Sequence, residues 1–143
     1  MASEKVLLVD DDAEFTEALA ERMATRGLKV DTVNSGQSAI DQAKQVSYDA
    51  IVLDLAMPGM DGLETLKALL KRQPDLQIIL LTGHATVEKG VEAVKLGAVD
   101  FLEKPANIQE LMEKIKKARN QKMLLVENKI EDEITKILRE KGW

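Results

Sequence analysis

The stretch Val6-Leu7-Leu8-Val9-Asp10-Asp11-Asp12 is a run of four apolar residues that ends in three carboxylates. Residues 51–54 and 78–82 repeat this form, and a weaker apolar run covers residues 99–102. Short apolar runs without alternation are typical of strands that are buried on both faces of a parallel sheet. Residues 28–33 alternate between apolar and polar side chains, which predicts a strand near an edge.

The segments between these runs carry apolar residues at helical spacing. The periodic positions are Phe15, Ala18, Leu19 and Met23; Ala39, Ile40 and Ala43; Leu63, Leu66, Leu69 and Leu70; Val87, Val91 and Val94; and Ile108, Leu111, Met112 and Ile115. Strand and helix therefore alternate five times, which predicts an α/β fold with one parallel sheet and helices on both faces. In such a sheet the carboxyl ends of all strands lie at one edge, where ligands bind.

The polar residues that follow the apolar runs are expected to meet at that edge. Carboxylate oxygens are the ligands that Mg²⁺ prefers, so the pair Asp10 and Asp11 is a candidate metal clamp. Asp54 stands alone after its strand and is the candidate nucleophile, since a carboxylate can form an aspartyl phosphate. Lys104 and Thr82 could neutralise and hydrogen-bond a transferring phosphoryl group. Asp12 precedes the first helix and is expected to cap it.

Composition excludes several classes of function. The chain has 143 residues, no cysteine and one histidine, which excludes disulfides, thiolate metal sites and multi-histidine zinc sites. Its net charge is −5 and only 3% of its residues are aromatic, which argues against binding to nucleic acid. No apolar run approaches the roughly 20 residues that cross a bilayer, and no signal peptide is evident. We therefore expect a cytoplasmic protein with no membrane partner.

Four motifs together resemble the receiver domain of a two-component response regulator. They are residues 9–11, 54–62, 82–83 and 104–105, each placed after an apolar run, and the resemblance covers residues 5–119. It implies a flavodoxin-like (βα)5 fold, a doubly wound parallel sheet with strand order 2-1-3-4-5. We expect a signalling switch rather than an enzyme.

The resemblance also implies a role for each matching residue. Asp54 accepts a phosphoryl group from a sensor histidine kinase or a phosphotransfer protein. The residues expected to bind Mg²⁺ are Asp10, Asp11, Asp54 and the backbone carbonyl of Ala56. Those expected to respond to the phosphoryl group are Lys104, Thr82 and the switch aromatic Phe101, with a cis bond before Pro105. His84 lies near Thr82, and its role is left open.

Three alternatives compete with this interpretation. A receiver-like module could bind partners without phosphorylation, although Asp54, Thr82 and Lys104 are all present. An aspartyl-phosphate phosphatase of the haloacid dehalogenase kind could use Asp10 and Asp12, but this family's following threonine is missing. A flavin-binding electron carrier would place its phosphate beside Asp10-Asp11-Asp12, which would repel it.

The segment 120–143 extends beyond the receiver, which is expected to occupy residues 1–119. Its apolar residues form a helical stripe: Met123, Val126, Ile130, Ile134 and Ile137. This stripe is out of phase with Leu111 and Ile115, so the helix is expected to slip phase or bend near Asn120. The stripe could pack on its own domain or form a short coiled coil in a homodimer. The face of the fourth helix, fifth strand and fifth helix is a second candidate dimer surface. The extension resembles helices that join receivers to ATPase-type transcription activators.

Overall fold

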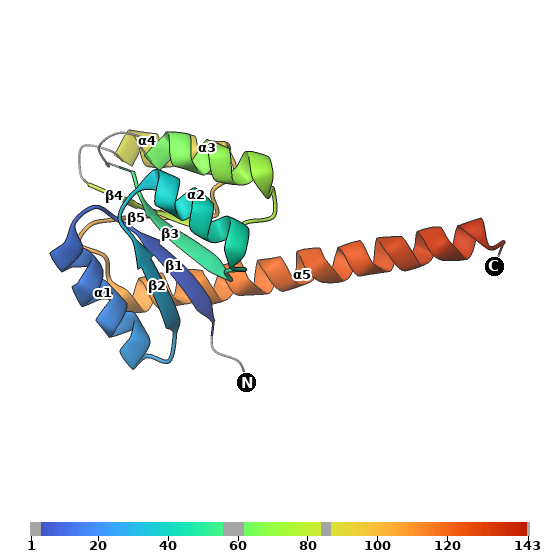
Figure 1. Ribbon diagram of the computed structural model, residues 1–143, viewed down its shortest axis with the longest axis horizontal. Coiled ribbons are helices and arrows are strands. Elements are labelled where there is room, and N and C mark those ends of the chain that lie inside the picture. Colours follow the sequence, from blue (N-terminus) through green and yellow to red (C-terminus); the bar gives the residue numbers. More distant parts are fainter. Residues whose placement is uncertain (1–3, 56–61, 84–86, 143) are drawn as a thin grey trace.

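The computed structural model describes residues 4–55, 62–83 and 87–142, in which strands and helices alternate (Figure 1). The strands are β1 (Lys5–Val9), β2 (Lys29–Val33), β3 (Ala50–Asp54), β4 (Ile78–Thr82) and β5 (Asp100–Glu103). The helices are α1 (Ala13–Thr25), α2 (Gly36–Gln45), α3 (Gly62–Arg72), α4 (Val87–Lys95) and α5 (Ile108–Glu140). The predicted alternation of strand and helix is confirmed.

All strand pairs are parallel, and the strand order is β2-β1-β3-β4-β5. This is the doubly wound, flavodoxin-like order that the resemblance to receiver domains implies. β2 lies at one edge, and its residues are partly or fully exposed, whereas β3 and β4 are buried throughout. The alternating pattern of residues 28–33 therefore marks an edge strand, as expected.

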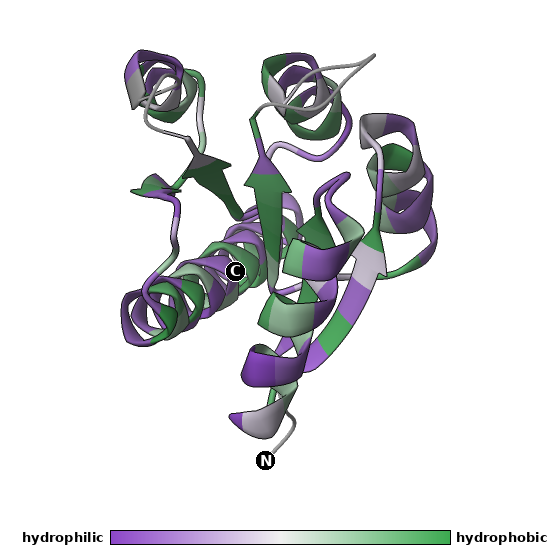
Figure 2. Ribbon diagram, turned by 90° about the vertical axis from the view of Figure 1, so that its left-hand side faces the viewer, coloured by the Kyte–Doolittle hydropathy of each residue, from purple (hydrophilic) through white to green (hydrophobic). Residues whose placement is uncertain are grey.

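The sheet separates two hydrophobic cores. Leu7 and Val9 of β1 face one core, while Val6 and Leu8 face the other. Helices α2, α3 and α4 cover the first face, and α1 and α5 cover the second (Figure 1). Hydrophobic strands accordingly lie between helices that carry hydrophilic residues on their outer sides (Figure 2). Continuous apolar runs are required because successive side chains enter different cores.

Two helices do not turn the expected residues inward. In α4, Val91 and Val94 are 45% and 38% exposed, while Ala93 is fully buried. The helix lies so close to the sheet that only small residues fit beneath it, and the valines are displaced to the outside. In α1, Ala18 is exposed and Ala20 packs against the core instead.

A close backbone contact fixes the start of α3. A Cβ atom at Gly62 would lie 2.3 Å from the Cα of Leu55 and 2.6 Å from the carbonyl oxygen of Asp54. The backbone N–H of Gly62 donates to the carbonyl of Leu55 at 3.1 Å. A residue without a side chain is therefore needed where α3 meets the end of β3.

Helix α5 continues from Ile108 to Glu140 without a break, and its extension follows the line of its first part (Figure 1), so the expected slip or bend near Asn120 is not found. The line of buried residues in α5, which includes Leu111, Ile115 and Ala118, continues in helical phase to Lys122 and Lys129. Lys122 donates to the hydroxyl of Ser47 at 3.0 Å and to the carbonyl of Tyr48 at 2.6 Å, and Lys129 pairs with Asp75. Lysines thus join the inner face, on which Leu125 is also half-buried, while the helix stays continuous.

The apolar stripe of the extension lies outside that inner line. Its members Met123, Val126, Ile130, Ile134 and Ile137 are between 48% and 52% exposed. The domain therefore leaves about half of each stripe residue uncovered. Among the described residues, no helix combines the length and the apolar character that crossing a bilayer requires.

Tyr48 links β2 to α2 through hydrogen bonds of its side chain. Its hydroxyl donates to Asp31 at 2.7 Å and accepts from the side-chain amide of Gln42 at 2.9 Å. The residue is 1% exposed. Burial and the hydrogen bond to Asp31 raise the pKa of Tyr48 from 10.0 to about 12.

This pKa predicts a loss of stability in alkali. Between pH 10 and 12 the unfolded chain has released the Tyr48 proton and the native protein has not, so the free energy of unfolding falls as pH rises. The loss is roughly 2–3 kcal/mol over that window. Tyr48 is the sole tyrosine of the chain, so tyrosinate absorbance reports it directly. We expect a native midpoint near 12 and a midpoint near 10 in urea. Equal midpoints in the two states would contradict the prediction.

Candidate functional site

Polar side chains from four strand ends meet at the carboxyl edge of the sheet. Asp10 follows β1, Asp54 ends β3, Thr82 ends β4 and Lys104 follows β5. Asp10 is 1% exposed and Asp54 is 4% exposed, while Thr82 is fully buried. Buried carboxylates are costly unless charged or hydrogen-bonding groups compensate them, so this cluster is a candidate site rather than a solvated surface.

Three carboxylates of the cluster share one small space. One oxygen each from Asp10, Asp11 and Asp54 lie within 4.8 Å of one another. This donor set consists of hard oxygen ligands with a charge of −3, which suits a divalent cation such as Mg²⁺. Asp12 is outside this group because its side chain accepts from the N–H of Phe15 at 3.1 Å and caps α1, as expected.

Lys104 brings a positive charge to two of these carboxylates. Its Nζ atom donates to Oδ2 of Asp10 at 2.9 Å and lies 3.5 Å from Oδ1 of Asp54. Burial by itself would lower the pKa of Lys104, but the hydrogen bond to Asp10 and the charges of both carboxylates outweigh it and raise that pKa. Lys104 therefore remains an ammonium group beside Asp54.

Thr82 and Phe101 lie together beneath α4. The hydroxyl of Thr82 donates to the carbonyl of Leu102 at 3.3 Å, so it is engaged with β5. A Cβ atom added to Gly90 would lie 3.0 Å from the ring of Phe101 and 3.1 Å from Cγ2 of Thr82. The two predicted switch residues thus share a contact with the same small residue of α4.

β5 is connected to α5 through Asp100. This carboxylate accepts from the N–H of Phe101 at 2.8 Å and also from the ammonium group of Lys114. Burial opposes ionisation, but the bonds from Lys114 and Phe101 prevail and lower the pKa of Asp100. An ion pair therefore joins the strand that carries Phe101 to the helix that leaves the domain.

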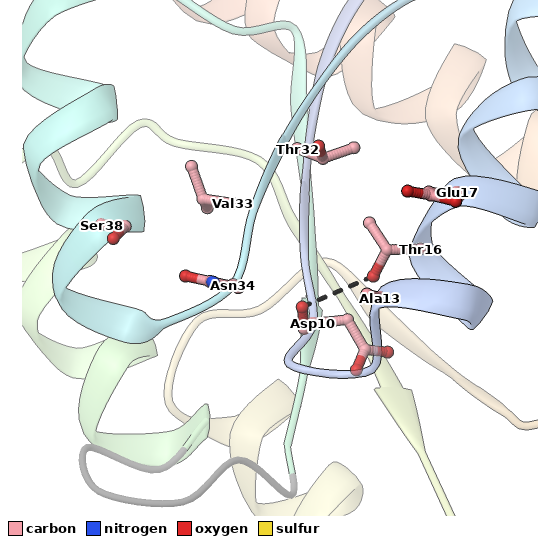
Figure 3. A pocket seen from close by; sticks show the side chains of 8 residues that line it. All are labelled: Asp10, Ala13, Thr16, Glu17, Thr32, Val33, Asn34 and Ser38. Atoms are coloured by element: carbon pink, nitrogen blue, oxygen red, sulfur yellow. Dashed lines mark hydrogen bonds between the residues drawn. The ribbon is translucent and has the colours of Figure 1, made fainter.

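A cavity of about 350 Å³ lies beside this cluster (Figure 3). Its lining comes from the end of β1, α1, the end of β2 and the start of α2: Asp10, Ala13, Thr16, Glu17, Thr32, Val33, Asn34 and Ser38. Asp54 and Lys104 do not line it, so the cavity adjoins the carboxylate cluster only through Asp10. The hydroxyl of Thr16 donates to the carbonyl of Asp10 at 3.4 Å and to that of Asp12 at 2.7 Å.

Several residues that the sequence singles out cannot be placed. The described residues do not include Ala56, residues 57–61 or His84. The bond between Lys104 and Pro105 is cis.

Phe15 contacts the site, although the sequence pattern predicts only a core residue at this position. Lys104 Nζ lies 4.4 Å from the centroid of the Phe15 ring. Phe15 has the helical spacing of a core residue, and no spacing signal links it to a lysine 89 positions later. Only the fold brings the two side chains together.

Comparison with known proteins agrees with this geometry. The family model described as the response regulator receiver domain matches residues 6–116. The chain belongs to this family. It is a receiver domain of the two-component systems, and the described residues of the four motifs that carry the resemblance lie at one edge of its sheet.

Relatives of this receiver domain are regulators. It is 38% identical over 129 residues to the C4-dicarboxylate transport transcriptional regulatory protein DctD of Pseudomonas aeruginosa, with 90% of this chain and 28% of DctD covered. It is 38% identical to the transcriptional regulatory protein FixJ of Bradyrhizobium diazoefficiens, with 81% of this chain and 57% of FixJ covered. The chain thus spans between about a quarter and three-fifths of the length of these relatives.

Solved structures share the fold of the receiver domain. A response regulator receiver domain protein from Clostridium thermocellum superposes with a TM-score of 0.80 at 31% identity, with 85% of this chain and 98% of that chain covered. Full-length FixJ from B. japonicum superposes with a TM-score of 0.79 at 36% identity, with 85% of this chain and 60% of that chain covered.

The carboxylate cluster predicts opposite effects for two neighbouring substitutions. Asp11 is exposed and adds repulsion, so Asp11→Asn is expected to raise the free energy of unfolding by up to about 1 kcal/mol. Asp10 accepts from Lys104 and from the N–H of Asp12, so Asp10→Asn is expected to lower it by about 1–3 kcal/mol. Urea denaturation in EDTA measures both changes.

The matched control is Asp132→Asn, which removes an exposed carboxylate from α5 far along the extension. It should leave stability unchanged within about 0.5 kcal/mol. A destabilised Asp11→Asn protein would contradict the prediction, because favourable interactions of Asp11 would then outweigh the repulsion within the cluster.

Proposed function

We propose that this receiver domain is a phosphorylated switch in which Asp54 accepts a phosphoryl group from a sensor histidine kinase or a phosphotransfer protein. The observation that carries the proposal is the buried carboxylate of Asp54, 3.5 Å from the ammonium of Lys104 and grouped with Asp10 and Asp11. An oxygen of Asp54 forms a bond to phosphorus while the bond from phosphorus to the donor atom breaks.

The residues around Asp54 have separate roles in this reaction. Lys104 neutralises an equatorial oxygen of the transferring group, and the hydroxyl of Thr82 donates to another. Asp10, Asp11 and Asp54 would hold Mg²⁺, with the carbonyl of Ala56 as a further ligand by family resemblance. The ion would supply positive charge that offsets the charge of the phosphoryl oxygens.

The response to phosphorylation starts from the bonds already described. To reach the phosphoryl group, Thr82 must give up its bond to the carbonyl of Leu102. Its movement changes the space shared with Gly90 and Phe101, and the ion pair between Asp100 and Lys114 carries a displacement of β5 to α5. Phosphorylation thus biases a two-state face formed by α4, β5 and α5.

A signalling role is favoured over turnover of a substrate. The relatives are described as regulatory proteins. A phosphatase using Asp10 and Asp12 is disfavoured because Asp12 is engaged as the cap of α1. The remaining alternative is a module that binds partners without phosphorylation.

Intact mass after incubation with acetyl phosphate tests the proposal. We expect a Mg²⁺-dependent gain of one phosphoryl group in the wild-type protein and no gain in Asp54→Asn. The control Asp41→Asn changes an exposed carboxylate on α2 and should gain the group normally. No gain in the wild-type protein would favour the phosphorylation-independent module.

We also propose that the extension of α5 pairs with a second copy of this chain. Its apolar stripe is half-exposed, and its spacing fits a short coiled coil. The match to DctD covers 90% of the chain, more than the 119 residues expected for the receiver alone, so the likeness reaches into the extension. Exposed Val91 and Val94 of α4 make the α4-β5-α5 face a second contact surface.

Sedimentation equilibrium tests this pairing. Ile130→Glu places a charge in the stripe and is expected to weaken dimerisation at least tenfold, because a coiled coil would bury that charge. Thr135→Glu adds the same charge to an exposed position off the stripe and should leave the dimer intact. A wild-type protein that sediments as a monomer would contradict the pairing.

A further inference from the structure

Lys104 contacts an uncharged aromatic ring in addition to the carboxylates of Asp10 and Asp54. Its Nζ atom lies 4.4 Å from the centroid of the Phe15 ring, within the range of a cation–π interaction. We propose that Phe15 is a positioning residue for phosphoryl transfer, whose ring holds the ammonium of Lys104 beside Asp54. This inference rests on the proposed function and assigns a role to a residue outside the family's motifs.

The ring suits this task because it does not compete for the same atoms. Asp10 and Asp54 hold Lys104 through carboxylate oxygens, and both carboxylates belong to the group that suits a divalent cation. A carboxylate engaged by a metal attracts the ammonium less strongly. The face of Phe15 attracts a cation through its quadrupole and offers no oxygen ligand.

The position of Phe15 is fixed from two sides. Its backbone N–H donates to the cap residue Asp12, and the hydroxyl of Thr16 bonds to the carbonyls of Asp10 and Asp12. Its side chain packs against the core shared by α1 and α5. The ring is therefore held in place before Lys104 meets it, so little additional side-chain entropy is lost in the contact.

Substitutions that change the ring's electrostatics at nearly constant shape test this role. With acetyl phosphate as donor, no partner has to dock on α1. Phe15→Leu should slow phosphorylation of Asp54 about two- to fivefold, the factor expected for losing a partly exposed cation–π contact. Phe15→Trp should restore the rate, and singly to triply fluorinated phenylalanine at position 15 should slow it progressively.

A second readout detects the contact itself. In metal-free protein, the side-chain methylene protons of Lys104 next to Nζ should show an upfield ring-current shift by NMR. Phe15→Leu should abolish the shift, and Phe15→Trp should retain it. Met112→Leu is the matched control, because Met112 packs on the same core from α5, and it should leave both rate and shift unchanged.

The outcomes separate this inference from the proposed function. A wild-type protein that gains no phosphoryl group would overturn the proposed function, whatever the shift. Equal rates for wild type, Phe15→Leu and the fluorinated proteins would overturn the positioning role while leaving Asp54 as acceptor. A slow Phe15→Leu protein with full rates in the fluorinated series would also overturn it, since packing alone would then explain the loss.

Discussion

The burial of two carboxylates at one edge of the sheet is the constraint on which the site depends. Asp10 and Asp54 are almost inaccessible, and such groups cost several kcal/mol each unless they are compensated. Lys104 compensates both, although it lies 94 positions from Asp10 in the chain. This cluster can form only if the fold brings the ends of β1, β3 and β5 to a common edge. The site therefore depends on the parallel arrangement of the sheet.

Close packing connects this cluster to the surface of the protein. Small residues in α4 let the helix approach β4 and β5, and Thr82 and Phe101 both contact the position of Gly90. Because α4 rests on small side chains, Val91 and Val94 point outward and create an apolar surface. A shift of Thr82 would therefore change the packing beneath α4, whose opposite side is exposed.

Helix α5 serves two purposes on two faces. Its inner face begins with apolar residues in the core and continues with Lys122 and Lys129, which hold the extension against loops at the edge opposite the carboxylate cluster. Its apolar stripe remains exposed along the outer part. The ion pair between Lys114 and Asp100 links the same helix to β5. The direction of the extension is therefore set by polar contacts, while its apolar surface stays available to a partner.

The apolar runs and their polar ends were sufficient to predict the parallel sheet and the cluster of Asp10, Asp54, Thr82 and Lys104, whereas the strand order came from the resemblance to receiver domains. A strand buried on both faces must be continuously apolar, and parallel strands must end at one edge. Periodicity did not predict which face of α4 is buried, because the close approach to Phe101 selects small residues over large apolar ones. Nor did it predict the straight course of α5 or the contact of Phe15 with Lys104. Those features depend on distances between elements far apart in the chain, and only tertiary packing decides them.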